Sequence, residues 1–208
     1  MTPFFVRLSI LVTFLFTIPL AVIHVQPYDD SDLRTILLPE DCPAPCFLGI
    51  TPGITPIDEA LQILETHTWV ESYEYNPPSS IIIVEWNDTS PDWFTNEATI
   101  RIDENHITEI GLQTSLQLGQ VQLLLGETSL RAISLEQFEG HNYLAFSTFY
   151  FDREIAAAVY KVCEQKGMRI TFNDDTFLIF IDYGEVKQSD LSKAYPHTWA
   201  DVVRTTCQ

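Results

Sequence analysis

Four cysteines carry the sharpest chemistry in the sequence: Cys42, Cys46, Cys163 and Cys207. The first two form a C-x3-C motif, CPAPC, which can be a disulfide, a pair of free thiols, a redox-active dithiol or two thiolate ligands for copper. No histidine or methionine lies near the motif to complete a metal site, and disulfides are typical of exported proteins. We favour a structural Cys42–Cys46 disulfide, with Cys163 and Cys207 left to pair, although four cysteines allow three pairings and the sequence does not settle the choice.

Two groups of acidic residues are candidate ligand or catalytic sites. Asp88, Asp92 and Glu97 lie in the polar loop NDTSPDWFTNE, where carboxylates are of the kind that bind calcium, but their spacing is not that of an EF-hand loop. Asp174 and Asp175 are adjacent, yet N-D-D-T between two apolar segments is typical of a hairpin turn. Hydrolase, metalloprotease and phosphate-binding motifs do not occur. We therefore assign no catalytic residue, no cofactor and no metal, and keep calcium at this loop as an alternative.

Trp93 and Phe94 lie in the same loop and are candidate contacts for a partner. Exposed aromatic side chains are frequent hot spots of protein interfaces, so this interpretation predicts that the loop binds a protein. In the alternative interpretation, both rings fold back over the sheet and have a structural role.

The first 28 residues are typical of an export signal or a membrane anchor. Arg7 precedes an apolar run from Leu8 to Val25 that contains no acidic residue, lysine or arginine. About 20 apolar residues are needed to cross a bilayer as a helix, and small residues of a cleavage site are missing near the end of the run. We predict a single-pass helix in the cell membrane, with the C-terminal domain outside the cytoplasm. Secretion after cleavage is the alternative.

The rest of the chain reads as two copies of one helix-plus-strands pattern. The segments that we predict are a signal or anchor, a linker with CPAPC, repeat 1, repeat 2 and a C-terminal tail: residues 1–28, 29–46, 47–115, 116–186 and 187–208. The predicted fold class is α+β, with two tandem helix-plus-antiparallel-sheet repeats behind an N-terminal transmembrane helix or signal.

Helix signals support this organisation. Thr55 is the predicted N-cap of a helix that begins with Pro56, has apolar side chains at spacings of three and four, and is followed by alternating strand segments. LQLGQVQLLLG predicts a second helix, which Gly126 ends. We interpret DREIAAAVYKVCEQKG, within repeat 2, as an inserted third helix.

Two segments, GITPIDEALQIL from Gly53 and LGQVQLLLG from Leu118, resemble the repeats of a known family. They are similar to the start and helix of the repeats in the outer-membrane small-protein-A lipoproteins and in the beta-lactamase inhibitory proteins, over residues 47–184 at most. The resemblance implies a short helical layer on antiparallel strands, and action by binding proteins. The chain departs from that pattern by lacking a lipobox cysteine, by having Glu127 where proline often follows the glycine, and by the inserted helix. No functional residue of the family can be carried over.

Charge narrows the class of partner. The chain has 29 acidic and 11 basic residues and a formal net charge of −18. The electrostatic field of this negative charge repels nucleic-acid phosphates and anionic lipid headgroups, so we predict no nucleic-acid partner. The predicted function is that of a membrane-tethered, extracytoplasmic, non-catalytic domain that binds a protein of the cell envelope, with the sheet surface or the loop at Trp93 as the contact. The alternative is a thiol redox or metal-binding protein that uses Cys42 and Cys46.

Overall fold

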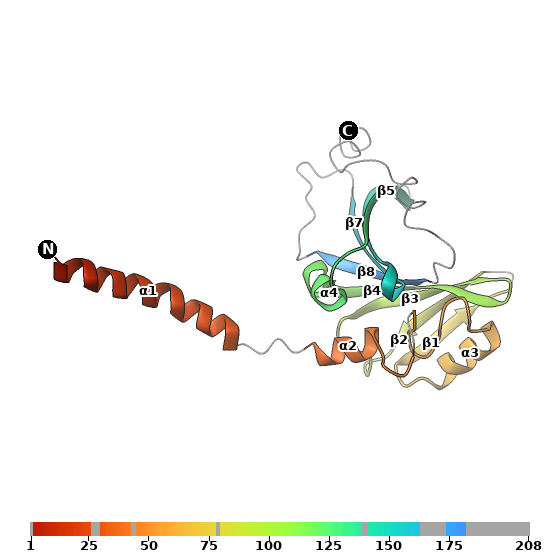
Figure 1. The fold of residues 1–208 in the computed structure, drawn as a ribbon. Helices are drawn as coiled ribbons and strands as arrows, with labels where there is room; N and C mark the ends of the chain where they lie inside the picture. The colour runs from red at the N-terminus through yellow and green to blue at the C-terminus, as the bar shows by residue number, and fades with distance from the viewer. Residues whose placement is uncertain are drawn as a thin grey trace. The chain divides into compact units, whose positions relative to one another are not determined.

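The computed structural model describes residues 2–25, 30–42, 45–77, 80–138, 141–162 and 174–181 (Figure 1). The chain divides into two compact units, residues 1–32 and 33–208. Each unit is described by itself below. Cys163, Cys207 and the predicted C-terminal tail lie outside the described residues.

The first unit contains one long helix, α1 (Thr2–Val25). The hydroxyls of Thr13 and Thr17 donate to carbonyl oxygens one turn earlier, at 2.9 Å each. Across the described parts of the chain, no helix combines the length and the hydropathy that a membrane span requires. This finding contradicts the single-pass membrane helix that the sequence predicted for this segment.

The second unit is built on one eight-stranded antiparallel sheet. Its strands are β1 (Val70–Tyr75), β2 (Ile81–Trp86), β3 (Phe94–Asp103), β4 (His106–Gln117), β5 (Leu130–Phe138), β6 (His141–Tyr150), β7 (Ile155–Val162) and β8 (Asp175–Ile181). Their order in the sheet is β1-β2-β3-β4-β8-β7-β6-β5. Strands β1 to β4 and β5 to β8 are each paired consecutively, and β4 pairs with β8 where the two groups of strands meet (Figure 1).

This sheet corrects the predicted fold class. All described strands belong to one antiparallel sheet, and few described helices accompany it. The prediction of two helix-plus-sheet repeats is therefore wrong. The predicted inserted helix is wrong as well, because its described residues, 152–162, form most of the 3-10 turn η1 (Phe151–Arg153) and strand β7 (Ile155–Val162). Residues 155–159 are all buried. A strand buried on both faces shows no alternation of polar and apolar residues, and its run of small apolar residues was mistaken for a helix face.

Three helices accompany the sheet: α2 (Ser31–Leu37), α3 (Ile57–Thr66) and α4 (Leu118–Leu125). Helix α3 has Asp58 and Glu59 in its first turn, where the helix dipole favours negative charge. Its N-cap is Pro56, and the hydroxyl of Thr55 instead accepts a hydrogen bond from the Thr51 amide at 2.8 Å. The predicted cap was therefore one residue too early. Gly126 follows α4 with φ of 87°, a backbone conformation that suits glycine.

The core lies on one face of the sheet. Seven side chains in register form a row on this face: Tyr75, Ile82, Ile100, Ile110, Phe180, Ile155 and Tyr150. All but Tyr75 are buried, and Ala60 and Leu64 of α3 and Val121 and Leu124 of α4 belong to the same cluster. Phe47 is 2% exposed, and its ring contacts those of Phe180, Phe94 and Trp86. Burial of these side chains against the helices supplies the main stabilisation of the fold.

Two threonines satisfy backbone groups where β4 and β8 separate. The register between these strands shifts between Gln113 and Gln117. There, the hydroxyl of Thr114 donates to the Thr176 carbonyl at 2.8 Å, and the hydroxyl of Thr176 donates to the Leu116 carbonyl at 2.9 Å. Both side chains are buried, so these bonds avoid the cost of leaving polar backbone atoms unpaired at the junction.

Candidate functional site

Cys42 and Cys46 form a disulfide. Cys46 is 2% exposed, and the next residue, Phe47, lies in the core. The disulfide therefore links Cys42 to a buried cysteine that directly precedes the core residue Phe47. Burial makes Cys46 poorly accessible to an attacking thiolate, whereas Cys42 is half-buried.

The predicted calcium ligands are not brought together. Within the described residues, no group of three or more His, Cys, Asp or Glu side chains is close enough to hold a metal ion. Asp88 and Asp92 are exposed in the loop, whereas Glu97 lies on β3, opposite Glu85 of β2. The loop is held instead by Asn87, whose amide nitrogen donates to the Thr68 carbonyl at 2.8 Å.

The predicted partner contacts Trp93 and Phe94 fold back over the sheet. Phe94 is 9% exposed and belongs to the core, so it is not a surface contact. Trp93 is half-buried, and its ring meets that of Phe94 edge-on, with 4.5 Å between the ring centroids. The loop therefore presents much less aromatic surface than a loop tip with two exposed rings would.

The adjacent acids Asp174 and Asp175 have structural positions. The Asp174 carboxylate pairs with Lys161 at 2.5 Å, and its backbone carbonyl accepts a hydrogen bond from the Leu118 amide at the start of α4. Asp175 begins β8. The two residues connect α4, β7 and β8, which accounts for them without catalysis.

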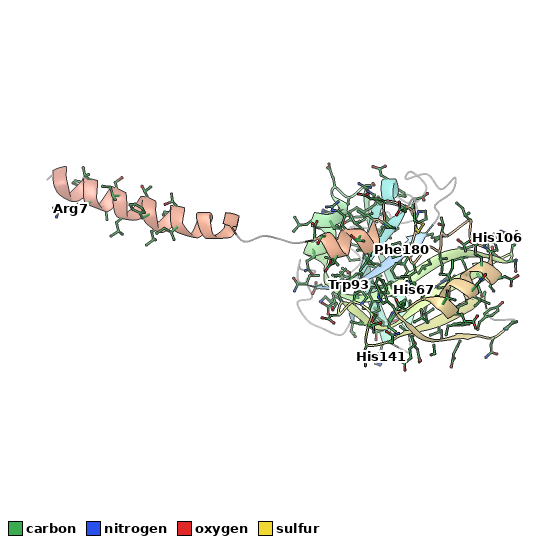
Figure 2. All side chains as sticks on the ribbon, turned by 90° about the horizontal axis from the view of Figure 1, so that it is seen from below. Arg7, His67, Trp93, His106, His141 and Phe180 are labelled. Carbon is green, nitrogen blue, oxygen red and sulfur yellow. A yellow bond between two sulfur atoms is a disulfide. The ribbon has the colours of Figure 1, made fainter. Side chains whose placement is uncertain are left out.

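Three described histidines lie at separate places on the sheet unit (Figure 2). His106 begins β4, His141 begins β6, and His67 follows α3. The Nδ1 atom of His67 accepts a hydrogen bond from the Trp69 amide at 3.2 Å, and burial lowers the pKa of its imidazole. The His67 ring also meets the Trp69 ring edge-on, with 5.0 Å between the ring centroids, so both of these contacts link the end of α3 to Trp69.

His67 makes the stability of the fold depend on pH. Its folded-state pKa is lowered below 6.5, so between the two values the unfolded chain binds more protons, and stability should fall as pH drops below about 6.5. We expect NMR titration to give a pKa below 6.5 for His67, and His67→Gln to reduce the loss of stability between pH 7 and pH 5. A measured pKa at or above 6.5 would contradict this explanation.

The best candidate site is the face of the sheet opposite the core, here called the open face. Its apolar members with exposed or half-buried side chains are Ile81, Ile83, Phe149, Tyr160, Phe177 and Ile179, whereas Ala156 on the same face is only 2% exposed. Buried residues of α2, α3 and α4 belong to the core cluster, whose strand residues lie on the other face, so these helices pack on the core face: Leu37, Ala60, Leu64, Val121, Leu124 and Leu125. Ile81 is 39% exposed and Tyr160 is 44% exposed.

Strand register explains how these residues come together. One row of side chains crosses all eight strands: Glu74, Ile83, Thr99, Gly111, Ile179, Ala156, Phe149 and Leu130. Neighbouring strands place directly paired residues on the same face, so residues far apart in sequence become one surface. The sequence predicted a sheet surface as a possible contact but not its residues, because these depend on the pairing of β4 with β8 and of β8 with β7.

An aromatic pair stands near the centre of the open face. The Phe177 ring lies against the backbone at Gly111, where an added Cβ atom would be 2.6 Å from the Phe177 Cζ atom. The ring of Tyr160 meets that of Phe177 edge-on, with centroids 6.1 Å apart. The Phe177 ring can therefore occupy this position only because Gly111 has no side chain.

Acidic side chains surround part of the apolar surface. Glu74, Glu85, Glu97, Glu109 and Asp175 lie on the open face by strand alternation. Glu109 pairs with Arg101 at 3.2 Å, and Glu85 accepts a hydrogen bond from the Ser72 hydroxyl at 2.6 Å. The open face therefore combines an apolar centre with a mainly acidic margin on the β1–β3 side.

Comparisons of the chain with protein-family models, with curated proteins and with solved structures give no match. The resemblance to the small-protein-A and beta-lactamase inhibitory repeats accordingly stays a prediction.

Proposed function

We propose that the protein is an exported, non-catalytic domain that binds another protein through the open face. The observation that carries this proposal is the apolar surface on a sheet face that none of the described helices covers. Contiguous exposed apolar surface is costly in water, and on soluble proteins it commonly marks an interaction site. Phe149, Tyr160 and Phe177 supply rings of the kind that dominate binding energy in interfaces.

Charge favours a particular kind of partner. The acidic margin of the open face and the net charge of −18 attract a surface with basic residues around an apolar centre. Such complementarity raises the rate of association and weakens with salt. We therefore propose a basic protein surface as the partner, and binding that declines as ionic strength rises.

Export is proposed from the N-terminal pattern and the disulfide. Arg7 followed by an apolar run is typical of a signal, and a Cys42–Cys46 disulfide persists in an oxidising compartment. We propose a secreted form as the functional one. Intact-mass measurement of the native protein identifies its N-terminus. A chain that begins near residue 25 would support secretion, whereas a chain that includes residue 1 would contradict it.

Loss of a co-purifying partner from an open-face variant tests the binding proposal. The double variant Ile81→Glu/Tyr160→Glu places two charges on exposed positions of the open face, while Ile54→Glu changes a 70% exposed residue elsewhere. We expect a partner protein to co-purify from the native host with the wild-type and Ile54→Glu chains. Its amount should be at least about tenfold lower with the double variant, because burying an unpaired charge in the interface costs more than about 1.4 kcal/mol. An unchanged set of co-purifying proteins would contradict the proposal, provided that both variants have wild-type melting temperatures.

A further inference from the structure

A separate pocket lies on the helix side of the sheet unit, between α4 and the start of β5. It has a volume of about 880 Å³, within the range of small-molecule sites. Its walls come from one side of α4, the turn after that helix and the first residues of β5: Gly119, Gln122, Leu123, Gly126, Glu127, Thr128, Ser129, Leu130 and Arg131. The pocket shares only Leu130 with the row that crosses the open face, so it does not depend on the function proposed for that face.

Arg131 is the only cationic side chain among the described residues that line the pocket. Glu127 also lines it, but the described structure contains no ion pair between the two side chains and no hydrogen bond to the Arg131 guanidinium, which interacts electrostatically with the Tyr150 hydroxyl. Arg131 is exposed, and its guanidinium has no acidic partner among the described residues. Its guanidinium is therefore available for a ligand.

The chemistry of the lining defines the ligand class. A guanidinium presents a planar fork of donors that matches a carboxylate or a phosphate. Glu127 contributes negative charge to the same pocket, which disfavours a phosphate dianion more than a monocarboxylate. Leu123 and Leu130 add apolar surface, and Thr128 and Ser129 carry hydroxyls.

We propose that this pocket binds a monocarboxylate that carries an apolar group, with the carboxylate at Arg131 and the apolar group against Leu123, which is 73% exposed. Two sources share this chemistry: a free organic acid, and the C-terminal carboxylate of a peptide that ends in an apolar residue. Either ligand would give the Arg131 guanidinium an anionic partner and would cover the exposed side chain of Leu123.

NMR titration of the full chain tests the proposal. The probes are 4-phenylbutyrate and an acetylated tripeptide ending in leucine, and their neutral controls are 4-phenylbutanol and the amide of the same tripeptide. We expect saturable shifts of the Gly119, Gly126 and Arg131 backbone amides with at least one acid, and at least about tenfold weaker binding of its neutral control. Binding of the tripeptide alone would identify a peptide terminus as the source, and binding of phenylbutyrate would identify a free acid.

Variants separate the pocket from general charge effects. Arg131→Gln should weaken the acid at least about tenfold, Arg131→Lys should weaken it less, and Arg101→Gln, which removes a cation on the open face, should leave it unchanged. The amide spectrum of each variant without ligand reports whether it is folded. The proposal fails if neither acid gives saturable shifts, if the neutral controls bind equally well, or if Arg131→Gln binds as tightly as the wild type.

Discussion

Phe47→Ala should lose about 3–5 kcal/mol of unfolding free energy, the largest effect expected from a single substitution in this chain. The Phe47 side chain is 2% exposed, and its ring centroid lies 5.0 Å from that of Phe180, 5.9 Å from Phe94 and 6.3 Å from Trp86. Truncation to alanine removes these contacts and leaves a cavity between three strands. Urea unfolding under oxidising conditions, which keep the adjacent disulfide intact, measures the change.

The matched control is Ile54→Ala, at a 70% exposed position seven residues further on. It should change the unfolding free energy by no more than about 0.5 kcal/mol. A loss below about 1 kcal/mol for Phe47→Ala would show that the segment after CPAPC does not pack on the sheet as described.

Gly111→Val should destabilise the protein by about 1–3 kcal/mol and displace the Phe177 ring from the open face. Already the Cβ atom of any side chain at position 111 would lie 2.6 Å from the Phe177 Cζ atom and 2.8 Å from the Thr99 Oγ1 atom. The ring must therefore move away, which also breaks its contact with Tyr160. Thermal unfolding measures the stability, and aromatic NMR shifts of Phe177 and Tyr160 report the displacement.

A double-mutant cycle isolates the contact between position 111 and the ring. If Phe177 causes the clash, Gly111→Val should cost less in a Phe177→Ala background, by more than about 0.5 kcal/mol. Equal costs in both backgrounds would place the strain elsewhere, for example at Thr99, and would remove the role assigned to Gly111.

Local signals predicted some elements of this fold. The spacing of Ile57, Ala60 and Leu64 identified α3, because one buried face of a helix is visible at intervals of three and four residues. Gly126 marked the end of α4, since a glycine suits the backbone conformation after a helix. Both signals act within a few residues, and a sequence can show them directly.

Elements that depend on distant partners were not predictable. Strand β7 resembles a helix in sequence because Ala156, Ala157 and Ala158 are all buried between neighbouring strands and show no alternation. Thr114 and Thr176 are 62 residues apart, and only the pairing of β4 with β8 gives their hydroxyls a common role.

The residues of the candidate site were not predictable for the same physical reason. For Trp93 and Phe94 the sequence left two interpretations open, and the packed rings of Phe47 and Trp86 hold Phe94 in the core. The open face is assembled from strands of both halves of the chain, so its residues share no local pattern.

Site-specific photo-crosslinking at position 160 tests the central claim most directly. A benzophenone amino acid replaces Tyr160, which is exposed on the open face, and in a control chain it replaces Ile54. In the native host, we expect illumination to give a discrete adduct with one protein from position 160 and none from position 54. Adducts that are absent from position 160, or the same from both positions, would contradict protein binding through the open face.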